Sequence, residues 1–171
     1  MSGARGSAAS ASARLAPLLA LLLVACAPLP PFGPAAHALP VAPPATTRLL
    51  PFQTIDHGAD GGVTDARRAV VRDRTAWSLL WEQVTVGRSP IPRLPAVDFE
   101  KEMVLGVFLG LRRSAGYGVE IVALEESATE LLVRVRETAP VAGADTAQML
   151  TAPYHLVRAA RTDKAVRFVT G

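Results

Sequence analysis

Two apolar runs separated by a polar segment dominate the hydrophobic pattern of this chain. Residues 103–109 are apolar at nearly every position, which is typical of a strand buried on both faces. Residues 117–124 are rich in β-branched side chains, which favours a second strand. Residues 112–116 between them contain two arginines, a serine and a glycine, so we expect an exposed turn that joins the two strands as a hairpin.

One amphipathic helix is predicted over about residues 75–86. An apolar stripe at helical spacing falls on Trp77, Leu80, Trp81 and Val84. Thr75 is placed to cap the start of the helix, and Gly87 with the prolines after it would end the helix. The spacing favours packing of both tryptophans in a core over a ligand-stacking role.

Shorter segments of alternating apolar and polar residues indicate further strands. They cover residues 52–58, 69–72, 130–137, 154–160 and 165–169. Most connections are too short for parallel crossovers, which predicts antiparallel pairing. We therefore expect an α+β domain over residues 50–171, built as an antiparallel or partly closed, barrel-like sheet of six to seven strands with one helix packed on it.

The first 25 residues have the features of an export signal. Arg5 and Arg14 supply positive charge, and residues 15–25 form an apolar core without any acidic residue. This core is about half as long as a segment that spans a bilayer, so a transmembrane helix is not expected here.

The end of this signal resembles a bacterial lipobox. Residues 23–26 read Leu-Val-Ala-Cys, and Cys26 is the single cysteine of the chain, which excludes an internal disulfide. In this interpretation Cys26 carries a palmitate-type lipid and becomes the mature N-terminus. Cleavage after the A-x-A sequence that ends at Ala38 is the alternative. Ala27 stands where an inner-membrane retention signal has Asp, so resemblance to Gram-negative lipoproteins implies the outer membrane, facing either the periplasm or the cell surface.

A tether is predicted over residues 26–49. Residues 27–47 hold seven prolines and six alanines and no Asp, Glu, Lys or Arg, which favours a semi-stiff spacer. Of the 18 basic residues of the chain, two lie in the signal, so the mature chain has 16 basic and 15 acidic residues, or +1. No basic run or basic helix is present, so nucleic acid is not an expected partner.

The sequence contains no familiar catalytic or metal-binding pattern such as G-x-S-x-G, S-x-x-K, H-E-x-x-H or a P-loop. His57 and His155 are the histidines of the predicted domain, and each is expected to be a partly exposed residue at a strand end. Asp98, Glu100 and Glu102 would share one face of an extended strand, but a solvated edge fits them better than a cation site. We expect no enzymatic activity, no cofactor and no metal.

The loop after the first apolar run contains more than a turn requires. Gly116 permits a positive φ, which suffices to turn the chain. Tyr117 adds a large amphipathic ring of the type enriched at binding surfaces, and Arg112 and Arg113 add positive charge. Two roles remain open for Tyr117: contact with a partner, or packing against the helix.

These segments also resemble a known family. Asp-Phe at residues 98–99, Ser-Ala-Gly-Tyr at 114–117 and Thr-Ala-Pro-Tyr at 151–154 are similar to the Asp-Phe, T-G-G-Y and T-x-P-Y elements of the C-terminal domain of the PrcB family. The resemblance covers most of residues 50–169. Ser114 and Ala115 replace the usual Thr and Gly of the family, and the alanine stiffens the loop.

The resemblance implies a lipoprotein subunit that associates with a secreted protease and supports its stability. The expected partner-binding residues are Arg112, Arg113, Ser114, Gly116, Tyr117, Pro153 and Tyr154. One alternative is a protease inhibitor, because the Gly-Tyr loop is loosely similar to the T-T-G-Y loop of chagasin-type inhibitors. The other is a structural envelope lipoprotein without a specific partner.

Overall fold

The computed structural model describes residues 47–143 and 145–171. The predicted signal, Cys26 and nearly all of the predicted tether lie outside these residues. In the described part, eight strands and one helix follow one another as β1 (Arg48–Leu49), β2 (Phe52–Gly58), β3 (Arg67–Val71), α1 (Arg74–Val84), β4 (Glu102–Phe108), β5 (Gly118–Glu126), β6 (Glu130–Thr138), β7 (Tyr154–Ala160) and β8 (Ala165–Thr170).

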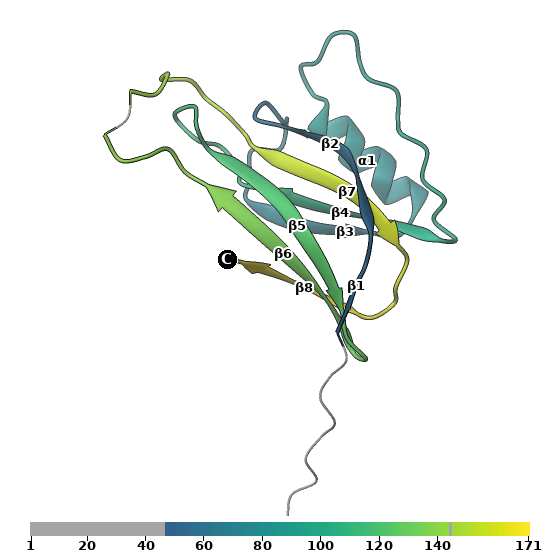
Figure 1. Cartoon of the computed structure of the whole chain (residues 1–171). Helices are drawn as coiled ribbons and strands as arrows, with labels where there is room; N and C mark the ends of the chain where they lie inside the picture. Colours follow the sequence, from purple (N-terminus) through teal and green to yellow (C-terminus); the bar gives the residue numbers. More distant parts are fainter. Residues whose placement is uncertain (1–46, 144) are drawn as a thin grey trace, which may run out of the picture. The chain divides into compact units, whose positions relative to one another are not determined.

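The strands form two sheets of four strands each (Figure 1). Sheet A has the order β1-β5-β6-β8, and sheet B has the order β2-β7-β4-β3. All neighbours are antiparallel except β6 and β8, which run parallel because the chain passes through β7 of sheet B between them. The α+β class and the predicted helix agree with this fold, whereas the prediction of one sheet, open or barrel-like, is wrong.

Two apolar cores separate three layers. One core lies between the sheets and includes Met103, Leu105 and Val107 of β4. The other lies between sheet B and α1 and includes Val104 and Phe108 of the same strand. β4 is therefore buried on both faces, as its continuous apolar sequence predicts, and each such side chain contributes about 1.5–3 kcal/mol through burial.

The predicted hairpin between the two apolar runs does not exist. β4 pairs with β3 and β7 in sheet B, while β5 pairs with β1 and β6 in sheet A. Residues 109–117 thus pass from one sheet to the other. The physical reason is that β4 lies in the middle layer and β5 in an outer layer, and both positions favour apolar residues. Two apolar strands therefore need not pair with each other.

The N-cap of α1 lies two residues earlier than predicted. Asp73, rather than Thr75, is the N-cap, and its carboxylate accepts a hydrogen bond from Ala76 N at 2.8 Å. The stripe of Trp77, Leu80, Trp81 and Val84 is buried, as predicted. Both indole N–H groups donate to carbonyls of the proline-rich segment after the helix, at 3.0 and 3.2 Å. Within residues 47–143 and 145–171, no helix combines the length and apolarity needed to cross a membrane.

Candidate functional site

Two loops meet at one end of the sheets and are called the loop pair below: residues 111–117, and residues 139–151 without 144 (Figure 1). Arg112 and Thr151 exchange backbone hydrogen bonds of 2.7 and 2.9 Å. The Thr151 hydroxyl donates to the Ser114 carbonyl at 3.1 Å, and Ala115 N donates to the Ala147 carbonyl at 3.0 Å. The two segments predicted to bind a partner are therefore joined directly to each other.

The loop pair displays large apolar side chains to solvent. They are 47 % to 80 % exposed and belong to Leu111, Val141, Met149 and Leu150. Their positions in the sequence do not mark them as binding residues. The available signal was weak: isolated apolar residues in loops that otherwise consist largely of small and polar residues.

The base of the loop pair is organised around Tyr117. The guanidinium carbon of Arg112 lies 5.6 Å from the centroid of the tyrosine ring, a cation–π distance. Both residues line a small cavity of about 130 Å³. Gly116 has φ +91°, and a Cβ there would lie 3.1 Å from Pro140 Cβ. Tyr117 is half-buried and belongs to neither core, so the alternative that it packs on the helix is wrong.

Tyr154, the other predicted binding tyrosine, is buried with only 1 % of its surface exposed. Its hydroxyl donates to Asp56 Oδ2 at 2.7 Å and accepts a hydrogen bond from Arg88. Arg88 also donates to Asp56 Oδ2 at 2.9 Å, and the Tyr154 ring stacks on Phe108 with centroids 6.3 Å apart. These four residues are called the Tyr154 cluster. Burial and the hydrogen bond to Asp56 raise the pKa of Tyr154 to about 12, against the opposing effect of Arg88, so the phenol stays neutral at pH 7.

The residues before Tyr154 form backbone hydrogen bonds that hold the surrounding loops in place. Ala152 N donates to the Ala59 carbonyl at 2.6 Å, and Gly61 N donates to the Ala152 carbonyl at 3.1 Å. The Pro153 carbonyl accepts from Leu109 N at 3.0 Å. Because Pro153 and Tyr154 are buried, neither can touch a partner in this conformation. Pro153 and Tyr154 support the loop pair from the interior of the domain.

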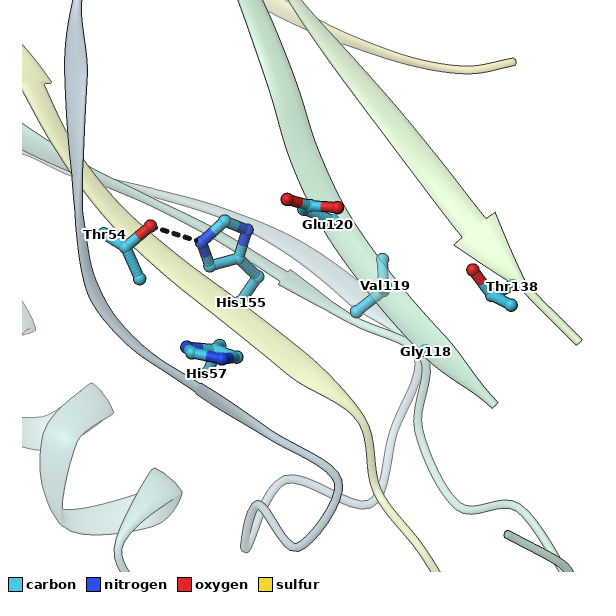
Figure 2. A pocket seen from close by; sticks show the side chains of 7 residues that line it. All are labelled: Thr54, His57, Gly118, Val119, Glu120, Thr138 and His155. Atoms are coloured by element: carbon cyan, nitrogen blue, oxygen red, sulfur yellow. Dashed lines mark hydrogen bonds between the residues drawn. The ribbon is translucent and has the colours of Figure 1, made fainter. Parts of the chain in front are cut away.

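A second cavity, of about 340 Å³, opens between the two sheets and contains both histidines (Figure 2). His155 is buried, contrary to the expected partial exposure, whereas His57 is exposed. The N–H of Ile121 donates to His155 Nδ1 at 2.9 Å. This contact requires an unprotonated Nδ1, so the proton resides on Nε2 and is donated to Thr54 Oγ1 at 2.9 Å.

His155 thus links sheet B to sheet A rather than serving as a free base. Burial lowers the pKa of His155, and His57 acts in the same direction, while the negative charge of Glu120 opposes them. Both ring nitrogens are already hydrogen-bonded, which leaves none available for a metal or a proton transfer. In the described residues, no three His, Cys, Asp or Glu side chains come together as a metal site.

The carboxylates at 98, 100 and 102 do not share a strand face. The Asp98 carbonyl accepts hydrogen bonds from Lys101 N and Glu102 N at 2.9 and 2.7 Å, so the chain turns here instead of extending. Asp98 also forms a 3.4 Å ion pair with Lys101. The solvated interpretation of these residues agrees with their positions.

The described part is thus a two-sheet domain with one helix, two loops joined by hydrogen bonds, and exposed apolar side chains on those loops. Residues 103–160 match the family model described as PrcB C-terminal. This stretch runs from β4 to β7 and contains the loop pair, and the match supports the resemblance to the PrcB C-terminal domain. No curated protein and no solved structure matches the chain.

Proposed function

We propose that this chain is a non-enzymatic, lipid-anchored accessory protein that binds and stabilises a secreted protease or another exported envelope protein. The observation that carries the proposal is the exposed apolar surface of the loop pair. Leu111 and Leu150 are the chain neighbours of Arg112 and Thr151, whose backbones are hydrogen-bonded to each other. Exposed apolar side chains at such a place favour a protein contact, because a partner removes them from water. The PrcB C-terminal match supports a subunit of a protein complex.

Rigidity also supports this role. The loop pair is held by backbone hydrogen bonds between Arg112 and Thr151 and by the Arg112–Tyr117 contact. A surface that is ordered before binding loses less conformational entropy when a partner arrives. Arg113, which is exposed, adds a positive charge beside the apolar residues. Partner contact is therefore assigned to Leu111, Arg113, Tyr117, Met149 and Leu150.

The test is capture of partners by the full-length, tagged chain from envelope extracts of the source cell, followed by identification of what co-purifies. Leu150→Lys should abolish recovery of a specific partner, and Tyr117→Ala should reduce it. Val122→Lys is the matched control, because Val122 is also an exposed apolar residue but lies on β5.

Three outcomes would overturn the proposal. Recovery of nothing above background is one, and equal recovery with Leu150→Lys and wild type is the second. The third is inhibition of a papain-like protease by the purified chain, with loss of inhibition in Tyr117→Ala, which would establish the inhibitor function instead.

A further inference from the structure

A groove lies between the outer strand of sheet B and the helix, apart from the loop pair. β3 ends the strand order of sheet B, and the groove of about 320 Å³ separates it from α1. Its walls include Arg67, Ala69 and Val71 from β3 and Ala76, Leu79 and Gln83 from α1.

The backbone of β3 has hydrogen-bonding groups free along this groove. Leu109 N donates to the Pro153 carbonyl, which lies on the β7 side of β4. Because the backbone groups of successive residues point to opposite sides of a strand, the N–H and C=O groups of Gly106 point toward β3, where Gly106 faces Ala69. The N–H and C=O groups of Arg68 and Val70 consequently point away from β4. In the described part of the chain no strand pairs with this edge. The edge can accept an added strand.

The side chains of the groove define what an added strand would present. Ala69 and Val71 face α1, and Leu79 at the mouth of the groove is 55 % exposed. In an extended peptide every second side chain points to the same face, so alternate residues would enter the space between β3 and α1. The small alanines at 69 and 76 leave room there for apolar side chains.

The positive charge of the groove favours a partner segment that contains Asp or Glu. Two arginines, Arg67 and Arg68, line it, and no Asp or Glu does. Arg67 donates to Gln83 at 2.6 Å, yet its Nε is buried without a hydrogen-bond partner in the described residues. Arg68 pairs with Glu137. Edge-to-edge pairing of two copies would bring these arginine-rich strands together, which like-charge repulsion disfavours.

We infer that the β3–α1 groove binds an extended segment of a partner protein, which joins the edge of sheet B as an additional strand. Alternate apolar side chains of the segment fill the groove, and one carboxylate of the segment meets Arg67. This site is separate from the loop pair and does not depend on the function proposed for it.

The test starts from a phage-displayed library of random peptides of about nine residues, long enough to form a strand, selected on the full-length chain. Enriched peptides should alternate apolar and polar residues and contain Asp or Glu. Their binding, measured by fluorescence anisotropy, should weaken about tenfold or more when peptide amides are N-methylated, because methylation removes the N–H donors that would pair with β3. Amide proton shifts should change at Arg68 and Val70.

Leu79→Lys should remove binding, whereas Val122→Lys, at an exposed apolar position outside the groove, should retain it. Leu150→Lys should also retain it, which separates this site from the loop pair. Failure to enrich any peptide, or equal binding by Leu79→Lys and wild type with both folded by circular dichroism, would overturn the inference. Concentration-dependent dimerisation that Leu79→Lys abolishes would also overturn it, by identifying a second copy as the occupant.

Discussion

The loop pair and Tyr154 lie only a few residues apart in the chain, yet they differ in exposure and in hydrogen bonding. Leu150 is exposed, while Tyr154, four residues later, is buried and hydrogen-bonded. Thr151, Ala152 and Pro153 between them each form a backbone hydrogen bond to another loop. These three residues mark the border between the exposed surface and its support.

This difference shows that an aromatic residue in a loop motif can have one of two roles: contact with a partner, or support of the loop from the core. Tyr117 and Tyr154 look alike in the sequence, because each ends a short segment of small or turn-forming residues. Tyr117 lies half-buried at the base of the exposed loops, whereas Tyr154 lies in the core beside α1. The Thr-Ala-Pro-Tyr segment thus positions the loop pair and does not itself contact a partner.

Removal of the Tyr154 ring should have the largest effect on stability. Tyr154→Ala should lower the free energy of unfolding by about 3–5 kcal/mol, the usual cost of deleting a buried aromatic ring. Tyr154→Phe should cost about 1–3 kcal/mol, because Asp56 and Arg88 lose a hydrogen-bond partner while the ring stays. Urea unfolding measures both. A loss below about 1 kcal/mol for the alanine variant would show that the cluster is not structural.

The loop that covers the Tyr154 cluster should be the next most sensitive. A Cβ at Gly62 would overlap the Gln83 carbonyl oxygen of α1 and lie 2.8 Å from Val86 Cβ. Because one of these atoms is backbone, Gly62→Ala should cost about 1–3 kcal/mol in unfolding experiments. Gly118→Ala is the control, since its nearest neighbour, Thr138 Cβ, is 3.8 Å away. Equal stability of the two variants would contradict the close packing of this loop.

Local elements of this fold could be predicted from the sequence, but strand pairing could not. The stripe of α1 and the buried faces of β4 and β6 follow from periodicity, because side-chain direction is set by local geometry. Whether β4 pairs with β5 depends on contacts with β3 and β7, which are distant in the sequence. The two-residue strand β1 is too short to show any periodicity.

The candidate site was predictable to a similar extent. The residues of the 112–117 loop and their proximity to the Thr151 segment agree with the sequence pattern and with the family resemblance. The burial of Tyr154 was not predictable, since it depends on Asp56 and Arg88, which are 98 and 66 residues away. Exposure of Met149 and Leu150 was missed for a similar reason: composition does not reveal which apolar residues remain uncovered.

Acidification should weaken the link between the two sheets at His155. The pKa of His155 in the folded chain is lowered from its unfolded value of about 6.5, so the unfolded state binds the proton more tightly. Above the unfolded-state pKa, His155 is unprotonated in both states and does not lower stability. Below it, the unfolded state binds the proton first, so the free energy of unfolding falls as the pH decreases through the folded-state pKa. Urea unfolding between neutral and mildly acidic pH should show a steeper loss for wild type than for His155→Gln. Identical pH profiles would refute this role.

The smallest stability effect is expected in the loop pair, where function should be most sensitive. Leu150→Lys places a charge at an already exposed position and should change the free energy of unfolding by no more than about 0.5 kcal/mol. The same variant should lose partner capture, whereas Tyr154→Phe should lose stability and, once folded, keep capture. Urea unfolding and capture measured on both variants test this. If Leu150→Lys unfolded as readily as Tyr154→Phe, the loop pair would be part of the structural support, and its exposed leucine would no longer argue for a binding surface.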